Sequence, residues 1–139
     1  MKIINSAIYA VAILGALTAQ AQADGYPAVP LLSTSKTVMD EEIAYPANGP
    51  AKINAMLVTI LPGEKTVAHQ HGVPLFVYVL EGEVTVDYGE HGKKVFTQGQ
   101  TFMEAMAIEH VGTNVTSSPV KLLAVYLSAE GAKDVIPRQ

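Results

Sequence analysis

The sequence contains no cysteine among its 139 residues. This absence excludes a disulfide framework, zinc fingers, iron–sulfur ligation, a cysteine nucleophile and a lipid-bearing N-terminal cysteine. Any metal ion must therefore be held by histidine, aspartate or glutamate. Positive charge is also scarce, because nine Lys and Arg stand against thirteen Asp and Glu, for a formal net charge of -4. This balance excludes a broadly basic nucleic-acid-binding surface and adhesion to anionic lipid through a polybasic patch.

Charged residues make up only 16% of the chain, whereas hydrophobic residues make up 49%. A chain so apolar and so weakly charged is typical of a folded protein and not of a disordered one. Its length fits one compact domain and leaves little room for a second.

The first 23 residues have the three parts of a secretory signal peptide. Lys2 gives a short positive start, an uncharged apolar run covers residues 7–17, and Ala-Gln-Ala at residues 21–23 supplies a small–x–small cleavage pattern. A transmembrane anchor is the alternative, but the run is short for a bilayer core of about 30 Å. We therefore expect cleavage after Ala23, and a periplasmic or secreted product with no stable membrane insertion.

The rest of the chain is typical of an all-β protein. Residues 24–50 contain four prolines and little periodicity, so we expect an irregular N-terminal arm there. Strand-sized apolar runs follow, each ended by a Gly or Pro turn signal, and together they indicate an antiparallel sandwich or barrel over residues 51–139. The expected strands cover residues 53–61, 75–80, 84–88, 94–97, 101–104, 110–115 and 121–127.

Two of these expected strands, residues 75–80 and 121–127, are apolar on both faces. A strand with two apolar faces must be covered on both sides. The barrel interior is one cover, and the second is either the N-terminal arm or another subunit. The second possibility predicts a homodimer whose interface includes the outward set Phe76, Tyr78 and Leu80.

Histidine is rare, with four in the whole chain. His69 and His71 form an H-x-H pair directly before the strand at 75–80. Residues two apart in an extended chain point to the same side, so both imidazoles can converge on one point, and neutral imidazole is the commonest metal ligand. The alternative is a pair of ordinary surface histidines. His110 lies beside another strand-like run, whereas His91 falls in a polar turn and is expected to be solvated.

The spacing of these residues resembles the two motifs of the cupin family. The first motif is glycine, five residues, H-x-H, three or four residues, glutamate, six residues and glycine, and its matches are Gly63, His69, His71 and Gly82. The second is glycine, five residues, P-x-G, two residues, histidine, three residues and asparagine, and its matches are Gly99, His110 and Asn114. The resemblance implies a double-stranded β-helix, a small jelly-roll barrel with a metal inside its mouth.

Two departures from the family pattern concern the metal site. The family's glutamate falls at Leu75, which cannot bind a cation, and the proline and glycine of the second motif are replaced by Ala105 and Ala107. The three histidines are retained. Either water completes a three-histidine site, or another carboxylate has taken the place of the glutamate.

Glu104 is the candidate for that carboxylate. Phe102 and Glu104 share a strand face by period two, so both point into the barrel if one does. Burying a carboxylate there costs free energy unless the carboxylate contacts a cation or a hydrogen-bond donor. The alternative is that Phe102 faces the other way, or that the strand has ended and Glu104 is solvated. The expected metal ligands are therefore His69, His71 and His110, with Glu104 as a possible fourth.

A site of this composition suits a divalent ion of Fe, Mn, Ni, Cu or Zn. The cupin family includes oxygenases, isomerases, sugar-binding domains and storage proteins, so the resemblance implies a fold more firmly than a function. Open coordination positions favour a metal-dependent oxygenase acting on a small organic molecule. The alternative is a non-catalytic cupin that binds a small ligand or a metal.

Overall fold

The computed structural model describes residues 26–138. The expected signal peptide, residues 1–23, lies outside these described residues. Within residues 26–138 there are nine strands and one short 3₁₀ helix, η1 (Gly89–His91), and no helix has the length and apolarity needed to cross a membrane. The strands are β1 (Ala51–Ile60), β2 (His69–His71), β3 (Leu75–Glu81), β4 (Glu83–Asp87), β5 (Lys93–Thr97), β6 (Thr101–Met103), β7 (Val111–Thr113), β8 (Val120–Ala129) and β9 (Val135–Pro137). All seven expected strands are present, and the sequence reasoning missed β2 and β9.

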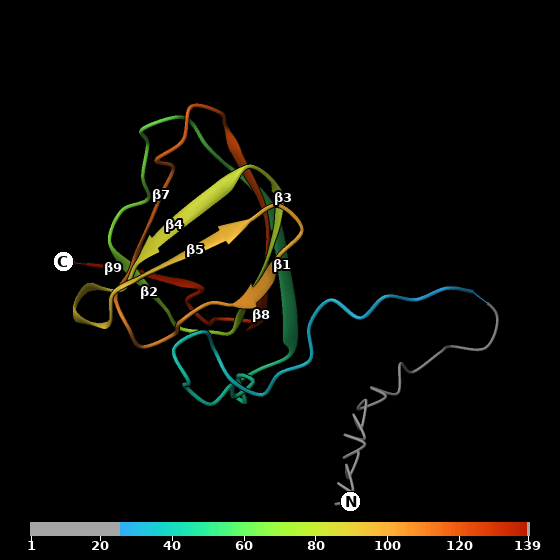
Figure 1. The fold of residues 1–139 in the computed structure, drawn as a ribbon. Coiled ribbons are helices and arrows are strands. Elements are labelled where there is room, and N and C mark those ends of the chain that lie inside the picture. Colours follow the sequence, from blue (N-terminus) through green and yellow to red (C-terminus); the bar gives the residue numbers. More distant parts are fainter. Residues whose placement is uncertain (1–25, 139) are drawn as a thin grey trace, which may run out of the picture.

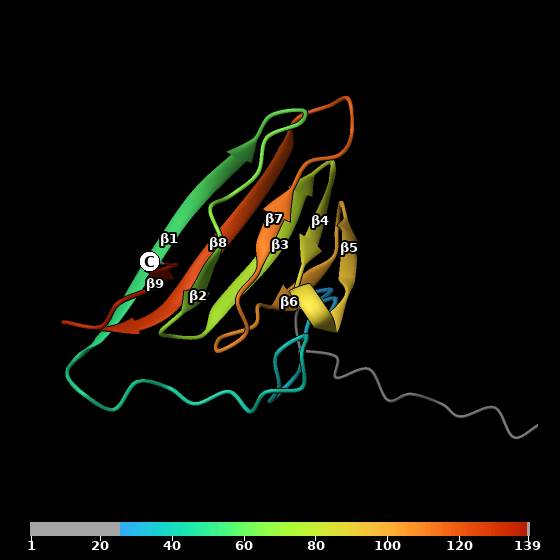
Figure 2. The same ribbon diagram turned by 90° about the vertical axis from the view of Figure 1, so that its left-hand side faces the viewer.

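The strands form antiparallel sheets that face one another. A four-stranded sheet has the order β1-β8-β3-β6, a three-stranded sheet the order β5-β4-β7, and β2 pairs with β9. Figure 2 shows β1, β8 and β3 in one layer and β4 and β5 in the other. This all-β architecture fits a jelly-roll barrel.

Period-two alternation decides which side chains enter the space between the layers. On β3, Leu75, Val77 and Val79 are buried, whereas the intervening Phe76, Tyr78 and Leu80 are only half-buried. Val84 and Val86 enter from β4 in the same way. The rings of Phe96 and Phe102 stack with centroids 3.7 Å apart. The core is therefore built from one face of each layer.

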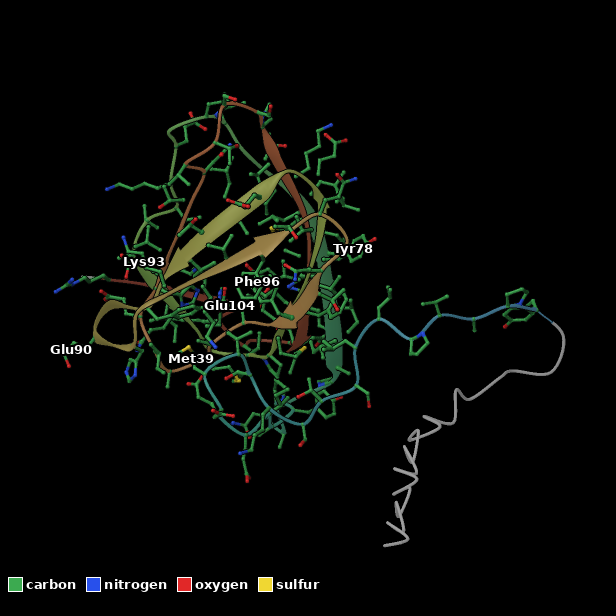
Figure 3. The ribbon with its side chains drawn as sticks, in the orientation of Figure 1. Met39, Tyr78, Glu90, Lys93, Phe96 and Glu104 are labelled. Carbon is green, nitrogen blue, oxygen red and sulfur yellow. The ribbon has the colours of Figure 1, made fainter. Side chains whose placement is uncertain are left out.

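The outer face of the four-stranded sheet carries apolar side chains. Ile53 and Leu57 on β1 are 61% and 71% exposed. They pair in register with Leu127 and Leu123 of β8. Figure 3 shows Tyr78 of β3 on this outward side of the molecule. Large apolar groups are thus open to solvent on this face within the single chain.

Residues 26–50, here called the N-terminal segment, begin away from the barrel and then run beneath one end of it (Figure 1). They are irregular except for a bridge between Lys36 and Glu42. The Val38 N–H donates to the Met103 carbonyl at 2.9 Å, and Val38 and Met39 pack against the core. The segment is therefore attached to the β6 edge of the four-stranded sheet.

Candidate metal centre

The two halves of the H-x-H pair lie on β2, which is held on both sides. Strand β9 pairs with one edge, so that His69 lies opposite Pro137 and His71 opposite Val135. On another side, His69 forms a bridge with His110, with N–O distances of 3.2 and 3.0 Å. These backbone bonds bring His110, forty-one residues further along the chain than His69, to the same place.

The three imidazoles converge. One ring nitrogen of each lies within 4.8 Å of those of the other two. The ring centroids are 4.8 Å apart for His69 and His71, 4.6 Å for His69 and His110, and 5.1 Å for His71 and His110. These residues were expected from the sequence as one cluster, and the structure brings them together.

Each imidazole uses its Nδ1 on a backbone carbonyl. His69 Nδ1 lies 2.7 Å from the Val67 oxygen, His71 Nδ1 3.1 Å from the Asp134 oxygen and His110 Nδ1 2.9 Å from the Ile108 oxygen. A carbonyl can only accept, so the proton of each neutral ring is on Nδ1. Each Nε2 then keeps a free lone pair, which is the arrangement that outer-shell partners impose on metal-binding histidines.

Burial keeps these rings neutral. It lowers the pKa of His69 and of His110, and it lowers the pKa of His71 to about 3. Nε2 of His71 is buried and has no hydrogen-bond partner among the described residues. An unpaired buried acceptor is unfavourable in a folded protein. A cation held among the three Nε2 atoms removes that deficit, so the residues present fit a metal ion.

Glu104 is the fourth ionisable group in this place. It follows directly after β6 and is only 5% exposed, and it lines one cavity with the three histidines. The strand has ended before Glu104, as one alternative supposed, yet the side chain still points inward with Phe102. Figure 3 shows Glu104 in the interior of the barrel.

The Glu104 carboxylate is held by one oxygen. Oε1 accepts the Tyr88 hydroxyl at 2.7 Å and the Ala105 N–H at 2.7 Å. Oε2 lies 3.9 Å from His110 Nε2. Burial raises the pKa of this carboxyl to about 7, with the two hydrogen bonds opposing the rise. One oxygen is therefore anchored and the other faces the histidines.

The two departures from the family motifs are linked in the structure. Leu75, at the position of the family's glutamate, is buried and lines the same cavity as an apolar side chain. Ala105, at the position of the family's proline, donates its N–H to Glu104. Proline has no N–H, so this bond requires another residue at that position. The chain thus lacks one carboxylate and has a backbone donor that orients another.

The cavity behind these side chains has a volume of about 90 Å³. Its remaining walls are mostly apolar and come from both layers of the barrel: Val58, Ile60, Leu75, Val77, Val84, Val86, Phe102, Leu122 and Ala124. Neither lysine nor arginine is among the described residues that line it. Thr66, Gly112 and Tyr126 complete the lining, so a molecule that enters meets mostly hydrocarbon beyond the histidine end.

The structure also places the residues expected to lie elsewhere. His91 is exposed in η1. Glu109 is not among the described residues that line the histidine cavity, and it pairs with Arg138 at 3.1 Å. The Asn114 side chain bonds Ile60, Thr116 and Ser118, as expected of a turn cap. Tyr88 was missed, although its alternation with Val84 and Val86 pointed it inward.

A comparison with known families gives one match that covers about half of the chain. The model of the cupin domain family matches residues 56–126, a range that contains His69, His71, Glu104 and His110. The chain belongs to the cupin family. No curated protein sequence matches this cupin.

Solved structures resemble this cupin to different degrees. The polyketide cyclase RemF from Streptomyces resistomycificus matches with a TM-score of 0.55 and 17% identity, over 72% of this cupin and 69% of that chain. An oxalate decarboxylase from Lactobacillus farciminis matches with a TM-score of 0.53 and 21% identity, over 61% of this cupin and 26% of that chain. A cupin-superfamily sugar phosphate isomerase from Silicibacter pomeroyi has a TM-score of 0.49 and 26% identity, over 55% of this cupin and 51% of that chain.

The cupin spans about half of the isomerase and about a quarter of the decarboxylase. At the identities of the cyclase and the decarboxylase, their likeness to this cupin concerns the fold alone.

Proposed function

We propose that this chain is an exported cupin that binds one divalent metal ion through Nε2 of His69, His71 and His110. The observation that carries the proposal is the buried Nε2 of His71, which has no partner within the described residues while the other two imidazoles converge on it. Because all three Nδ1 atoms bond carbonyls, the lone pairs are oriented before any ion arrives. The barrel thus provides a preformed ligand set.

Glu104 is the fourth ligand in this proposal. Its Oε1 is fully occupied by Tyr88 and Ala105, and Oε2 is left facing His110. A cation at the centre of the three imidazoles supplies the opposite charge that a carboxylate needs when it is buried. Three imidazoles and one carboxylate suit Fe, Mn, Ni, Cu or Zn in the divalent state.

The reaction that this site supports best is oxygenation of a small, mostly apolar organic molecule. A redox-active ion such as Fe(II) with an open position provides a place where oxygen and an organic ligand meet. The apolar walls hold the organic part and exclude water from the site. Within residues 26–138, the lining has no lysine or arginine to neutralise an anionic group away from the histidine end.

A second function, binding of a metal or small ligand without turnover, is favoured by one observation. Beyond the four proposed ligands, the cavity lining contributed by the described part of the chain includes no carboxylate or imidazole to serve as an acid or base. Oxygen consumption by the Fe(II)-loaded protein in the presence of small aromatic and aliphatic compounds separates the two functions. Metal binding without consumption with any of them supports the second.

The metal site is tested by elemental analysis of the protein purified from its exported compartment. We expect about one equivalent of a first-row divalent metal. Substituting both His69 and His71 by alanine should remove it, and the matched control His91→Ala should retain it, since His91 is exposed in η1. Equal metal content in the double variant and in the control contradicts the proposed site.

Export and assembly complete the proposal. Residues 1–23 act as a signal peptide, so the mature protein starts at Asp24 in the periplasm or outside the cell, and mass spectrometry of the exported protein tests this start. The apolar outer face of β1, β8 and β3 is covered by a second copy in a homodimer. The exposed Ile53 and Leu57 support this arrangement.

A further inference from the structure

Glu41 lies outside the part of the chain matched by the cupin family model, in the N-terminal segment. Its carboxylate accepts two backbone N–H groups of the loop that follows β6. Oε2 lies 2.8 Å from the Met106 nitrogen and Oε1 lies 2.7 Å from the Ala107 nitrogen. Hydrogen bonds to an ionised carboxylate are about twice as strong as neutral ones. One side chain therefore holds two successive peptide groups.

The turn that presents Glu41 is itself well fixed. Thr37 is buried, its hydroxyl donates to Glu41 Oε2 at 2.9 Å, and its N–H donates to the Glu41 carbonyl at 2.9 Å. Asp40 takes a φ of 62°, which closes the turn between them. Val38 and Met39 pack against the core beside this turn. The carboxylate is thus positioned by its own segment before it meets the loop.

The loop that Glu41 holds joins two of the proposed ligands, Glu104 and His110. Glu104 lies two residues before Met106, and His110 lies three residues after Ala107. The same two residues also bond β2, because the Met106 carbonyl accepts the His71 N–H at 3.0 Å and the Ala107 carbonyl accepts the Gln70 amide. The loop is therefore fixed between Glu41 and the H-x-H strand.

This contact also makes up for a change in the motif. A proline at position 105 would restrict the backbone φ, and this chain has alanine there and again at position 107. Ile108, whose carbonyl accepts the His110 Nδ1 proton, follows directly after Ala107. A shift of the loop therefore turns the His110 ring and moves Glu104. We propose that Glu41 is a positioning residue of the metal centre, and that the N-terminal segment is a working part of the site. This inference rests on the proposed function.

The test uses the full exported protein with four variants. Glu41→Ala removes both acceptors, and Glu41→Gln keeps one acceptor oxygen in nearly the same shape. Glu42→Ala and Glu42→Gln are matched controls, because the neighbouring side chain is exposed. Co²⁺ affinity and the visible absorption of the Co²⁺-saturated protein are measured for each, together with thermal stability. Loss of an outer-shell partner typically weakens metal affinity 10–100-fold.

We expect Glu41→Ala to weaken Co²⁺ binding at least about tenfold and to change the absorption spectrum, with Glu41→Gln between it and wild type. The Glu42 variants should match wild type. Lowered thermal stability with unchanged Co²⁺ affinity and spectrum in both Glu41 variants overturns the inference, because it shows a merely structural contact. If Glu41→Ala does not fold, the isosteric Glu41→Gln decides the outcome.

A wild-type protein that fails to bind Co²⁺ counts against the proposed function and not against the role of Glu41. Nitrogen NMR of the metal-free imidazoles then tests that role directly. We expect the wild-type and Glu42 variants to show His110 with its proton on Nδ1 alone, and the Glu41 variants to show a mixture of tautomers. Identical His110 signals in all five proteins overturn the inference.

Discussion

The strongest test of the metal centre is the substitution Glu104→Gln, because it should stabilise the metal-free fold and weaken metal binding. The amide keeps an oxygen for the Tyr88 and Ala105 donors and replaces Oε2 by an NH₂ group. That group lies 3.9 Å from His110 Nε2, beyond hydrogen-bond distance. The change therefore removes the charge and leaves the shape and the hydrogen bonds of the site in place.

The magnitude follows from the pKa of Glu104. Burial raises that pKa from 4.5 to about 7 in the metal-free fold. A raised carboxyl pKa means that the fold prefers the protonated form, so ionisation destabilises the fold as pH rises from 4.5 to 7. The penalty levels off above pH 7 at roughly 3 kcal/mol, at about 1.4 kcal/mol for each pKa unit. At pH 5 it is under about 1 kcal/mol.

We therefore expect metal-free Glu104→Gln to be more stable than the wild type by roughly 3 kcal/mol at pH 8, and nearly equal to it at pH 5. Urea unfolding followed by circular dichroism in EDTA measures both differences. With saturating Zn²⁺ the advantage should disappear, because loss of an anionic ligand lowers the affinity by about 100-fold, or roughly 3 kcal/mol. Competition titration with a chromophoric chelator measures that affinity.

Two results would refute this reasoning. A metal-free Glu104→Gln protein that is less stable than the wild type at pH 8 would show that burial of the ionised carboxylate does not destabilise the fold. A Zn²⁺ affinity equal to that of the wild type within about threefold would show that water, and not Glu104, completes a three-histidine site. The loss of a residue that binds the metal directly should lower the affinity more than the roughly 10-fold minimum that is typical for loss of an outer-shell partner.

Three further predictions follow from the same side chains. Introducing Leu75→Glu into the Glu104→Gln protein should restore Zn²⁺ affinity to within about tenfold of wild type, because Leu75 lines the same cavity. A titration in which the double variant binds Zn²⁺ no more tightly than Glu104→Gln would contradict this. Metal-free Glu104→Gln should lose stability below pH 6.5, because His71 binds a proton in the unfolded chain but stays neutral when it is buried in the fold. The expected loss is about 1.4 kcal/mol per pH unit for each such histidine. Urea midpoints that stay level from pH 7 to pH 5 would disprove this prediction. Light scattering should give a dimer for the wild type and a monomer for Leu57→Glu, because Leu57 is 71% exposed on the apolar outer face. Obligate homodimer interfaces bury roughly 2,000 Å² or more in total, so a buried charge there should prevent assembly. A wild-type monomer at micromolar concentration would rule the interface out.

Much of this fold was predictable because strand alternation is a local property. The buried set Leu75, Val77 and Val79 follows from period two within one strand, and the seven expected strands were present in the structure. The three-histidine cluster was predictable for a related reason. The spacing of His69, His71 and His110 matches two motifs of a family whose barrel brings them together, so the pattern carried long-range information that no single strand contains.

The remaining features depend on contacts between segments far apart in the chain. Strand β9 was not predicted from the sequence, because three residues are too few to show an alternating pattern. Its strand conformation depends on pairing with β2. The face that Glu104 presents was ambiguous, since β6 ends at Met103 and period two no longer applies beyond it. Tyr88 and Ala105 turn the carboxylate inward, and neither donor can be assigned before the chain is folded.

The sequence by itself therefore determined the all-β class, the strands that alternate and the three imidazoles of the centre. Only the tertiary structure decided how that centre is supported. Asp134 orients His71 from sixty-three residues away, and Glu41 holds Ala107 from sixty-six residues away. Both contacts depend on backbone groups, which every residue has. Their partners are chosen by the packing of the barrel and not by any side-chain pattern in the sequence.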